Sequence, residues 1–172
     1  MLHTFYSYII IAQVLALYLG DLMSIDYIIA LRDNAEKGRA EWSDVEEQLA
    51  LLVRTSEDTL PLETYTKILF WYADVIAKTP SRRPEAAPFA LRAAQRSLPA
   101  QDTVFAVKAN CLNVLCATHG APQEEFDRKY ATLLGVVDTL QASSPNMTNT
   151  MRSEIAWHLD HLRKVHDGVL EH

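Results

Sequence analysis

The sequence predicts an all-α protein with seven to eight helices packed as antiparallel hairpins, in a helical-repeat-like stack or an irregular bundle. Apolar residues recur at helical spacing along almost the whole chain. Proline and glycine interrupt this pattern about every 20 residues, as in stacked hairpins and up-and-down bundles. No segment combines alternating polarity with the β-branched composition of strands. With 172 residues, 49% of them hydrophobic, the chain can bury a core of its own.

Capping residues and prolines predict where the helices begin and end. Ser24 can cap the first helix, which Gly38 ends. Ser43 and Glu46 form a capping box at the start of the second helix. The later helices are expected to begin near Pro61, Pro84, Asp102, Pro122 and Ser144, and four of them are expected to end near Pro80, Pro99, Gly120 and Gly168.

Each predicted helix carries an apolar stripe that we expect to face the core. The helix between Asp102 and Gly120 carries two stripes, one through Val107 and Cys111 and one through Ala109 and Leu112. A helix that is apolar on two sides is expected to be central in the fold. The other stripes contain Ile25, Ile28 and Ile29; Val45, Leu49, Leu52 and Val53; Tyr65, Ile68, Leu69, Tyr72 and Ile76; Phe126, Tyr130, Leu133, Val137 and Leu140; and Met147, Met151, Ile155, Leu159, Leu162 and Val165.

Three regions are predicted: an apolar N-terminal helix (1–22), a helical domain (23–169), and a remnant of a polyhistidine tag (170–172). The first 20 residues contain no Asp, Glu, Lys or Arg. Their apolar run is short for a membrane-spanning helix, which needs about 20 residues. We therefore expect burial within the chain or in a homo-oligomer interface formed by residues 5–19. A membrane anchor and a signal peptide are the alternatives, and Met23 is an alternative start.

Glu154, His158 and His161 form a candidate metal site on the last predicted helix. They lie at positions i, i+4 and i+7 and share one stripe. Imidazole and carboxylate groups on one helix face can bind a divalent metal when a facing helix adds ligands. Asp127 and the pair 124–125 are acidic residues that could do so. The alternative is a solvated stripe at the border of the apolar face.

Cys111, Cys116 and His119 form a second candidate site, for zinc or for nucleophilic catalysis. The two cysteines lie five residues apart within a predicted helix, so their side chains point about 140° apart. This spacing disfavours a disulfide and a zinc motif. We expect reduced, packed core thiols and a histidine near a helix end.

The third candidate is a partner-binding surface formed by Arg82, Arg83, Arg92, Arg96 and Trp71. Between residues 78 and 96 there are five basic residues and one acid, whereas residues 41–63 contain seven acids and one base. Such patches can steer a charged partner, and an off-stripe tryptophan can anchor one. The alternative is that the two segments form complementary solvated faces of adjacent helices.

The composition and the missing motifs limit the function. The net charge of −6 gives no reason to expect nucleic acid as a partner. Phosphate loops, dinucleotide-binding glycine motifs and hydrolase motifs are absent. We expect a cytoplasmic, non-enzymatic, protein-binding module, such as an adaptor, immunity or regulatory protein, with another protein as partner and no cofactor. The alternative is a metal- or small-ligand-binding helical bundle that uses the last helix.

Overall fold

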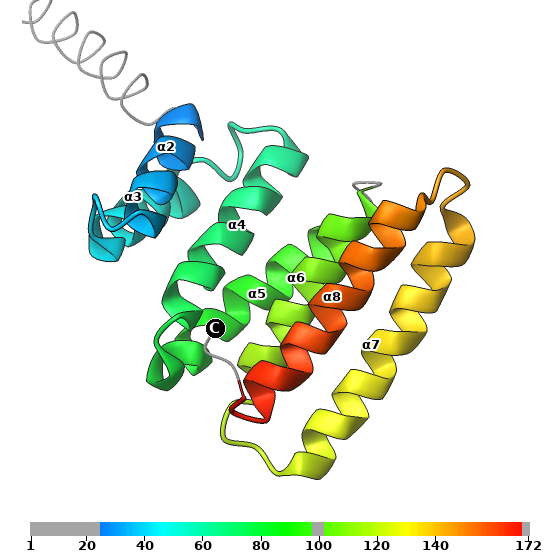
Figure 1. Ribbon diagram of the computed structural model, residues 1–172. Helices are drawn as coiled ribbons and strands as arrows, with labels where there is room; N and C mark the ends of the chain where they lie inside the picture. The colour runs from blue at the N-terminus through cyan, green and yellow to red at the C-terminus, as the bar shows by residue number, and fades with distance from the viewer. Residues whose placement is uncertain (1–24, 98–101, 170–172) are drawn as a thin grey trace, which may run out of the picture. The chain divides into compact units, whose positions relative to one another are not determined.

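The computed structural model describes residues 25–97 and 102–169, and within these ranges all regular structure is helical (Figure 1). This confirms the predicted all-α class. The helices are α2 (Ile25–Glu36), α3 (Trp42–Thr55), α4 (Leu62–Ala77), the 3₁₀ turn η1 (Pro80–Arg82), α5 (Arg83–Ser97), α6 (Thr103–Ala117), α7 (Gln123–Ser143) and α8 (Asn149–His166). The predicted N-terminal helix (1–22), its interface at 5–19 and the 170–172 segment lie outside the described residues.

The chain divides into two compact units, with the boundary after Leu52. In the described part of the first unit, Ile28 of α2 and Val45 and Leu49 of α3 are buried, as their stripes predict. Ile29 of the predicted α2 stripe is instead 41% exposed. The second unit begins at Val53 and contains helices α4 to α8. No helix in the described ranges has both the length and the apolar character needed to cross a membrane.

Helix ends follow the predicted capping chemistry at several positions. Asp102 accepts a hydrogen bond from the Phe105 amide at 3.1 Å, which satisfies one of the free amides at the start of α6. Gly120 has a φ of 72°. This left-handed conformation after α6 favours glycine, because a side chain would be strained there.

Two helices begin at other residues than the sequence predicts. The Ser144 hydroxyl donates to the Leu140 carbonyl at the end of α7 (2.7 Å), so α8 is capped instead by Thr148, which accepts from the Met151 amide. Helix α3 begins at Trp42, one residue before Ser43, so the predicted capping box lies inside the first turn.

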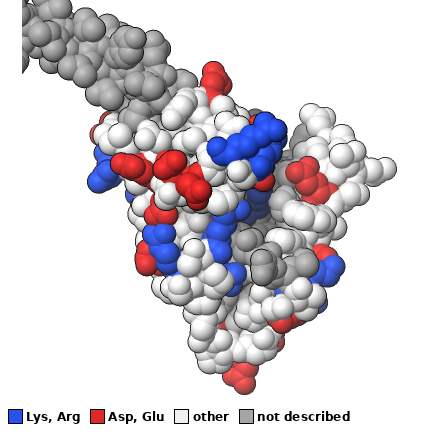
Figure 2. All heavy atoms as spheres, turned by 60° about the vertical axis from the view of Figure 1, so that its left-hand side comes forward, with Lys and Arg blue, Asp and Glu red and all other residues white. Residues whose placement is uncertain are grey.

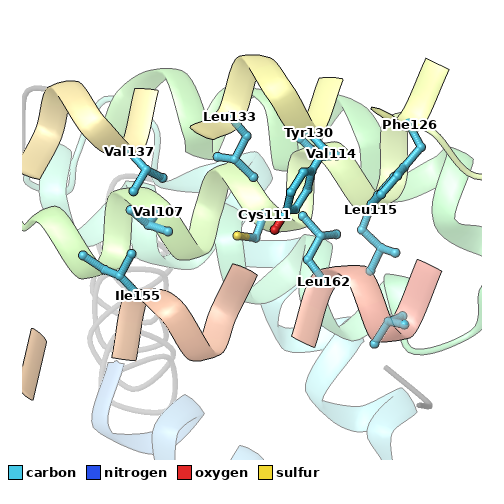
Figure 3. Packing of buried hydrophobic residues seen from close by; sticks show 11 residues of the cluster. Val107, Cys111, Val114, Leu115, Phe126, Tyr130, Leu133, Val137, Ile155 and Leu162 are labelled. Carbon is cyan, nitrogen blue, oxygen red and sulfur yellow. The ribbon is translucent and has the colours of Figure 1, made fainter. Parts of the chain in front are cut away.

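Helix α6 is central in the second unit, as its two apolar stripes predict. It packs against α4, α5, α7 and α8, and consecutive helices from α4 to α7 contact each other. One stripe of α6 meets α7 and α8 in a buried cluster (Figure 3). The members of this cluster are Val107, Cys111, Val114, Leu115, Phe126, Tyr130, Leu133, Val137, Ile155, Leu162 and Val165.

Candidate ligand-binding site

Side chains of α4, α6 and α8 line a cavity of about 210 Å³ that is open to solvent, which we call the central cavity. All three helices belong to the second unit. Most of the lining is apolar, and two lysines, two histidines and one aspartate add polar groups. The lining residues are Phe70 and Asp74 of α4 and Lys78, which directly follows it; Lys108, Cys111, Leu112 and Leu115 of α6; and Trp157, His158, His161, Leu162 and Val165 of α8.

Helical spacing brings these side chains to one place. On α6 the lining residues fall at i, i+3, i+4 and i+7 from Lys108, and on α8 they follow the same spacing from His158. On α4 they fall at i, i+4 and i+8 from Phe70. Residues at these intervals share one face of a helix. Each helix therefore contributes one continuous strip to the cavity wall.

His158 is a largely buried polar group that α8 contributes to the cavity, with 11% of its side chain exposed. Burial, together with the nearby Lys108 and His161, lowers the pKa of His158 from 6.5 to about 4. The imidazole is therefore uncharged at neutral pH, with one nitrogen as donor and one as acceptor. Its Nε2 lies 4.0 Å from the Glu154 carboxylate, at the limit of an ion pair.

Trp157 and His161 form part of the same wall. Their rings are stacked, with centroids 4.9 Å apart and an interplanar angle of 12°. Trp157 nevertheless remains 57% exposed, which is unusual for a large aromatic side chain. The stacked rings of Trp157 and His161 form a flat part of the cavity wall.

Lys108 is a site residue that sequence reasoning missed. Its ammonium lies 5.3 Å from the centre of the Phe70 ring, in a cation–π arrangement across α4 and α6. A signal was available in the sequence, because Lys108 is the only charged residue in α6. A single charged residue in a helix that is apolar on two sides indicates that its side chain has a defined partner or site.

The residues of the predicted metal site lie together only in part. His158 and His161 both line the central cavity, whereas Glu154 is exposed. The facing carboxylate in the cavity wall is Asp74 of α4, and not the acids of α7 that the sequence suggested. Across the described residues, no group of three or more His, Cys, Asp or Glu side chains is arranged to hold a metal ion. The metal site stays a prediction.

The predicted Cys111, Cys116 and His119 group does not form one site. Both thiols are buried and free, whereas His119 is exposed at the end of α6. Burial raises the pKa of both thiols to about 12. The thiols are therefore protonated at neutral pH, and the reactive thiolate form is scarce. This is the behaviour expected of core cysteines.

The predicted partner-binding surface is largely engaged within the protein. Arg92 and Arg96 both donate to the Glu57 carboxylate, at 2.7 and 2.6 Å. These two hydrogen bonds are the main reason why the pKa of Glu57 is lowered. Glu57 comes from the acidic segment and lies in the loop between α3 and α4, so these contacts join that loop to α5. Lys and Arg atoms lie interspersed with Asp and Glu atoms on the face in Figure 2.

The remaining residues of that surface differ in burial. Arg82 donates to Glu85 one turn later at 3.0 Å. Arg83 is buried, with 8% of its surface exposed, and its Nε donates to the Ala77 carbonyl at 3.4 Å. Trp71 is half-buried on α4. These residues therefore do not form one open basic patch.

Comparisons with protein-family models, curated protein sequences and solved structures give no significant match for this chain. The site must therefore be interpreted from its own geometry and chemistry.

Proposed function

We propose that this chain is a binding protein that takes up a small molecule, with an apolar body and an acidic group, in the central cavity. The observation that carries the proposal is the combination of an apolar lining with Lys108 at the wall. Small-ligand sites are typically concave and mostly apolar, with a few polar groups that orient the ligand. This function corresponds to the small-ligand alternative predicted from the last helix.

The apolar part of the ligand is specified by the lining. Leu112, Leu115, Leu162 and Val165 contribute aliphatic surface, and Phe70 contributes an aromatic ring. A cavity of about 210 Å³ has room for one aromatic ring with a short side chain. Transfer of such a group out of water is favourable by about 25 cal/mol for each Å² of apolar surface buried.

The acidic group of the ligand is specified by charge. The wall carries two ammonium groups, Lys78 and Lys108, against one carboxylate, Asp74. His158 adds no charge at neutral pH, because its pKa is lowered to about 4. It can still donate one hydrogen bond to a ligand oxygen. The surroundings therefore favour a carboxylate over an ammonium of the same shape.

The protonation states of the cavity support binding more than catalysis. A nucleophilic cysteine requires a lowered pKa, whereas the pKa of Cys111 is raised to about 12. A general acid or base works best with a pKa near the working pH, and His158 lies well below neutrality.

Three probes that share one body test the proposal: 3-phenylpropionate, 3-phenylpropanol and 3-phenylpropylamine. Each is titrated into protein with isotope-labelled methyl groups, and chemical shifts are followed by nuclear magnetic resonance. We expect the methyl groups of Leu112, Leu162 and Val165 to shift, with affinity falling from the carboxylate to the alcohol to the amine. Methyl groups that respond to none of the probes would contradict the proposal.

The variant Lys108→Gln separates the charge from the apolar contact. It should reduce the affinity for the carboxylate and leave that for the alcohol unchanged. The matched control is Lys67→Gln, which removes a lysine of α4 that pairs with Glu63 at 2.7 Å and does not line the cavity. This control should keep the preference of the wild-type protein.

The protein-binding module is the second candidate function, and the exposed Trp157 favours it. Interface hot spots are enriched in tryptophan, and Trp157 is 57% exposed beside the central cavity. A partner recovered in stoichiometric amount with the wild-type chain should be lost with Trp157→Ala. Equal recovery of the partner with the wild type and with Trp157→Ala would show that Trp157 is not part of the interface.

A further inference from the structure

A second cavity, of about 620 Å³, lies where the ends of α6 and α8 meet the start of α5; we call it the end cavity. Its basic residues come from four places: Lys78 follows α4, Arg83 begins α5, His119 follows α6 and His166 ends α8. No Asp or Glu is among its described lining residues. The other lining residues are Pro80, Leu115, Thr118, Gly120, Ala121, Val165 and Gly168.

Arg83 is the unusual member of this set, because more than nine-tenths of its surface is buried. Within the described residues, the hydrogen bond from its guanidinium goes to a neutral acceptor, the Ala77 carbonyl. The ionisable group that acts on it there is the Cys116 thiol, which is protonated at neutral pH. A buried charge is normally paired, and a guanidinium has five N–H donors. Arg83 therefore has donor capacity that an anion would satisfy.

His166, the last residue of α8, is held in place beside the end cavity. The His166 ring stacks on Phe126, with centroids 3.6 Å apart and an interplanar angle of 4°. Its Nε2 lies 3.0 Å from the Gln123 side-chain oxygen. This leaves the other ring nitrogen for a further partner.

We infer that the end cavity binds the phosphate group of a small molecule, with Arg83 as the principal ligand and Lys78, His119 and His166 around it. A guanidinium forms two parallel hydrogen bonds with an oxyanion, which fits Arg83 to phosphate and to carboxylate alike. The several basic groups around one space, without an acid among the described lining residues, favour the more highly charged phosphate. The inference goes beyond the proposed function, because Arg83 lines the end cavity and not the central cavity, although Lys78, Leu115 and Val165 line both.

Inorganic phosphate, with acetate and chloride at equal ionic strength as comparisons, tests this site. Isothermal titration calorimetry should give one phosphate site per chain, with acetate binding more weakly and chloride giving no saturable signal. Acetate binding as tightly as phosphate would assign the site to carboxylates and overturn the phosphate inference. Absence of saturable phosphate binding would overturn it as well.

Arg83→Met tests the principal ligand. Replacing a buried arginine with a long apolar residue is often tolerated or even stabilising, so this variant should fold. We expect phosphate affinity to fall about 30-fold or more, as for loss of one partner of a buried charge pair. The matched control is Arg82→Gln, which removes the neighbouring arginine outside the cavity lining and should bind phosphate as the wild type does.

The double variant His119→Gln with His166→Gln removes both imidazole rings, including the one that stacks on Phe126, and keeps a polar side chain at each position. It should bind phosphate more weakly than the wild type. Retained binding in Arg83→Met, or equal loss in Arg82→Gln, would show that the anion binds elsewhere. Binding of 3-phenylpropanol to the central cavity should be unchanged in Arg83→Met, which distinguishes the two sites.

Discussion

Burial shifts the pKa of several side chains in the second unit, and the shifts of His158, Cys111 and Cys116 are large. None of the three has the pKa of the free amino acid side chain, and in each case loss of contact with water is the main cause. For the thiols this means that chemical reactivity is suppressed. For His158 it means that the stability of the protein depends on pH.

The first prediction concerns His158. Its pKa is about 4 in the folded protein and 6.5 in a free side chain, so the unfolded chain binds more protons between these values. Stability should be full above pH 6.5 and fall as the pH is lowered towards 4, by about 2 to 3 kcal/mol. Urea unfolding of the wild type and of His158→Gln at pH 7 and pH 4.5 measures this contribution.

Carboxylates titrate in the same pH range, but they are present in both the wild type and His158→Gln. Their contribution to the pH dependence of stability therefore cancels when the two proteins are compared. The charged groups near His158 are Lys108 of α6, His161 and Glu154 of α8, and the α4 pair Asp74 and Lys78 in the cavity wall. All remain in the variant. If both proteins lose the same free energy between the two pH values, His158 is not buried in its neutral form.

At the scale of helices, the sequence predicts most starts because local chemistry determines them. Asp102 caps α6 in the structure, and the prolines at 61 and 122 directly precede α4 and α7. The start of α8 could not be predicted, because Ser144 and Thr148 are both good caps. The choice between them depends on tertiary contacts: the Ser144 hydroxyl lies 2.6 Å from that of Thr103 on another helix.

The second prediction tests these caps. Asp102→Ala and Thr148→Ala should each reduce the free energy of unfolding by about 1 kcal/mol, because each removes the acceptor for a backbone amide at a helix start. The measurement is chemical denaturation followed by circular dichroism. Thr132→Ala is the control, since Thr132 is exposed inside α7 and its hydroxyl bonds only within that helix. A cap variant as stable as this control would contradict the assignment.

At the scale of the whole molecule, the apolar stripes predict the core well and the cavities poorly. The stripes of α4, α6, α7 and α8 are buried or half-buried as expected, because one helix face is set by spacing alone. The cavity walls combine strips from three helices, and which strips meet depends on how those helices cross. Sequence spacing correctly placed His158 and His161 on one stripe. It could not place Lys108 opposite Phe70, or Arg83 beside the ends of α6 and α8.

The third prediction tests the cluster that joins α6, α7 and α8. Phe126 is 1% exposed and packs in this cluster, so Phe126→Ala should cost about 3 to 5 kcal/mol. Leu134 lies on the same helix but is 40% exposed, and Leu134→Ala should change stability by less than about 1 kcal/mol. Urea unfolding midpoints of both variants provide the measurement. Similar losses from the two variants would mean that α7 does not bury the face described here.

The central and end cavities share three wall residues, Lys78, Leu115 and Val165. Ligands in the two cavities would therefore contact the same side chains. If these contacts couple the two sites, each ligand changes the affinity for the other by the same factor. Lys78 determines whether one ligand strengthens or weakens binding of the other. An anion that binds the Lys78 ammonium in one cavity makes that ammonium unavailable to an anion in the other cavity. The two anionic ligands would then compete without ever touching.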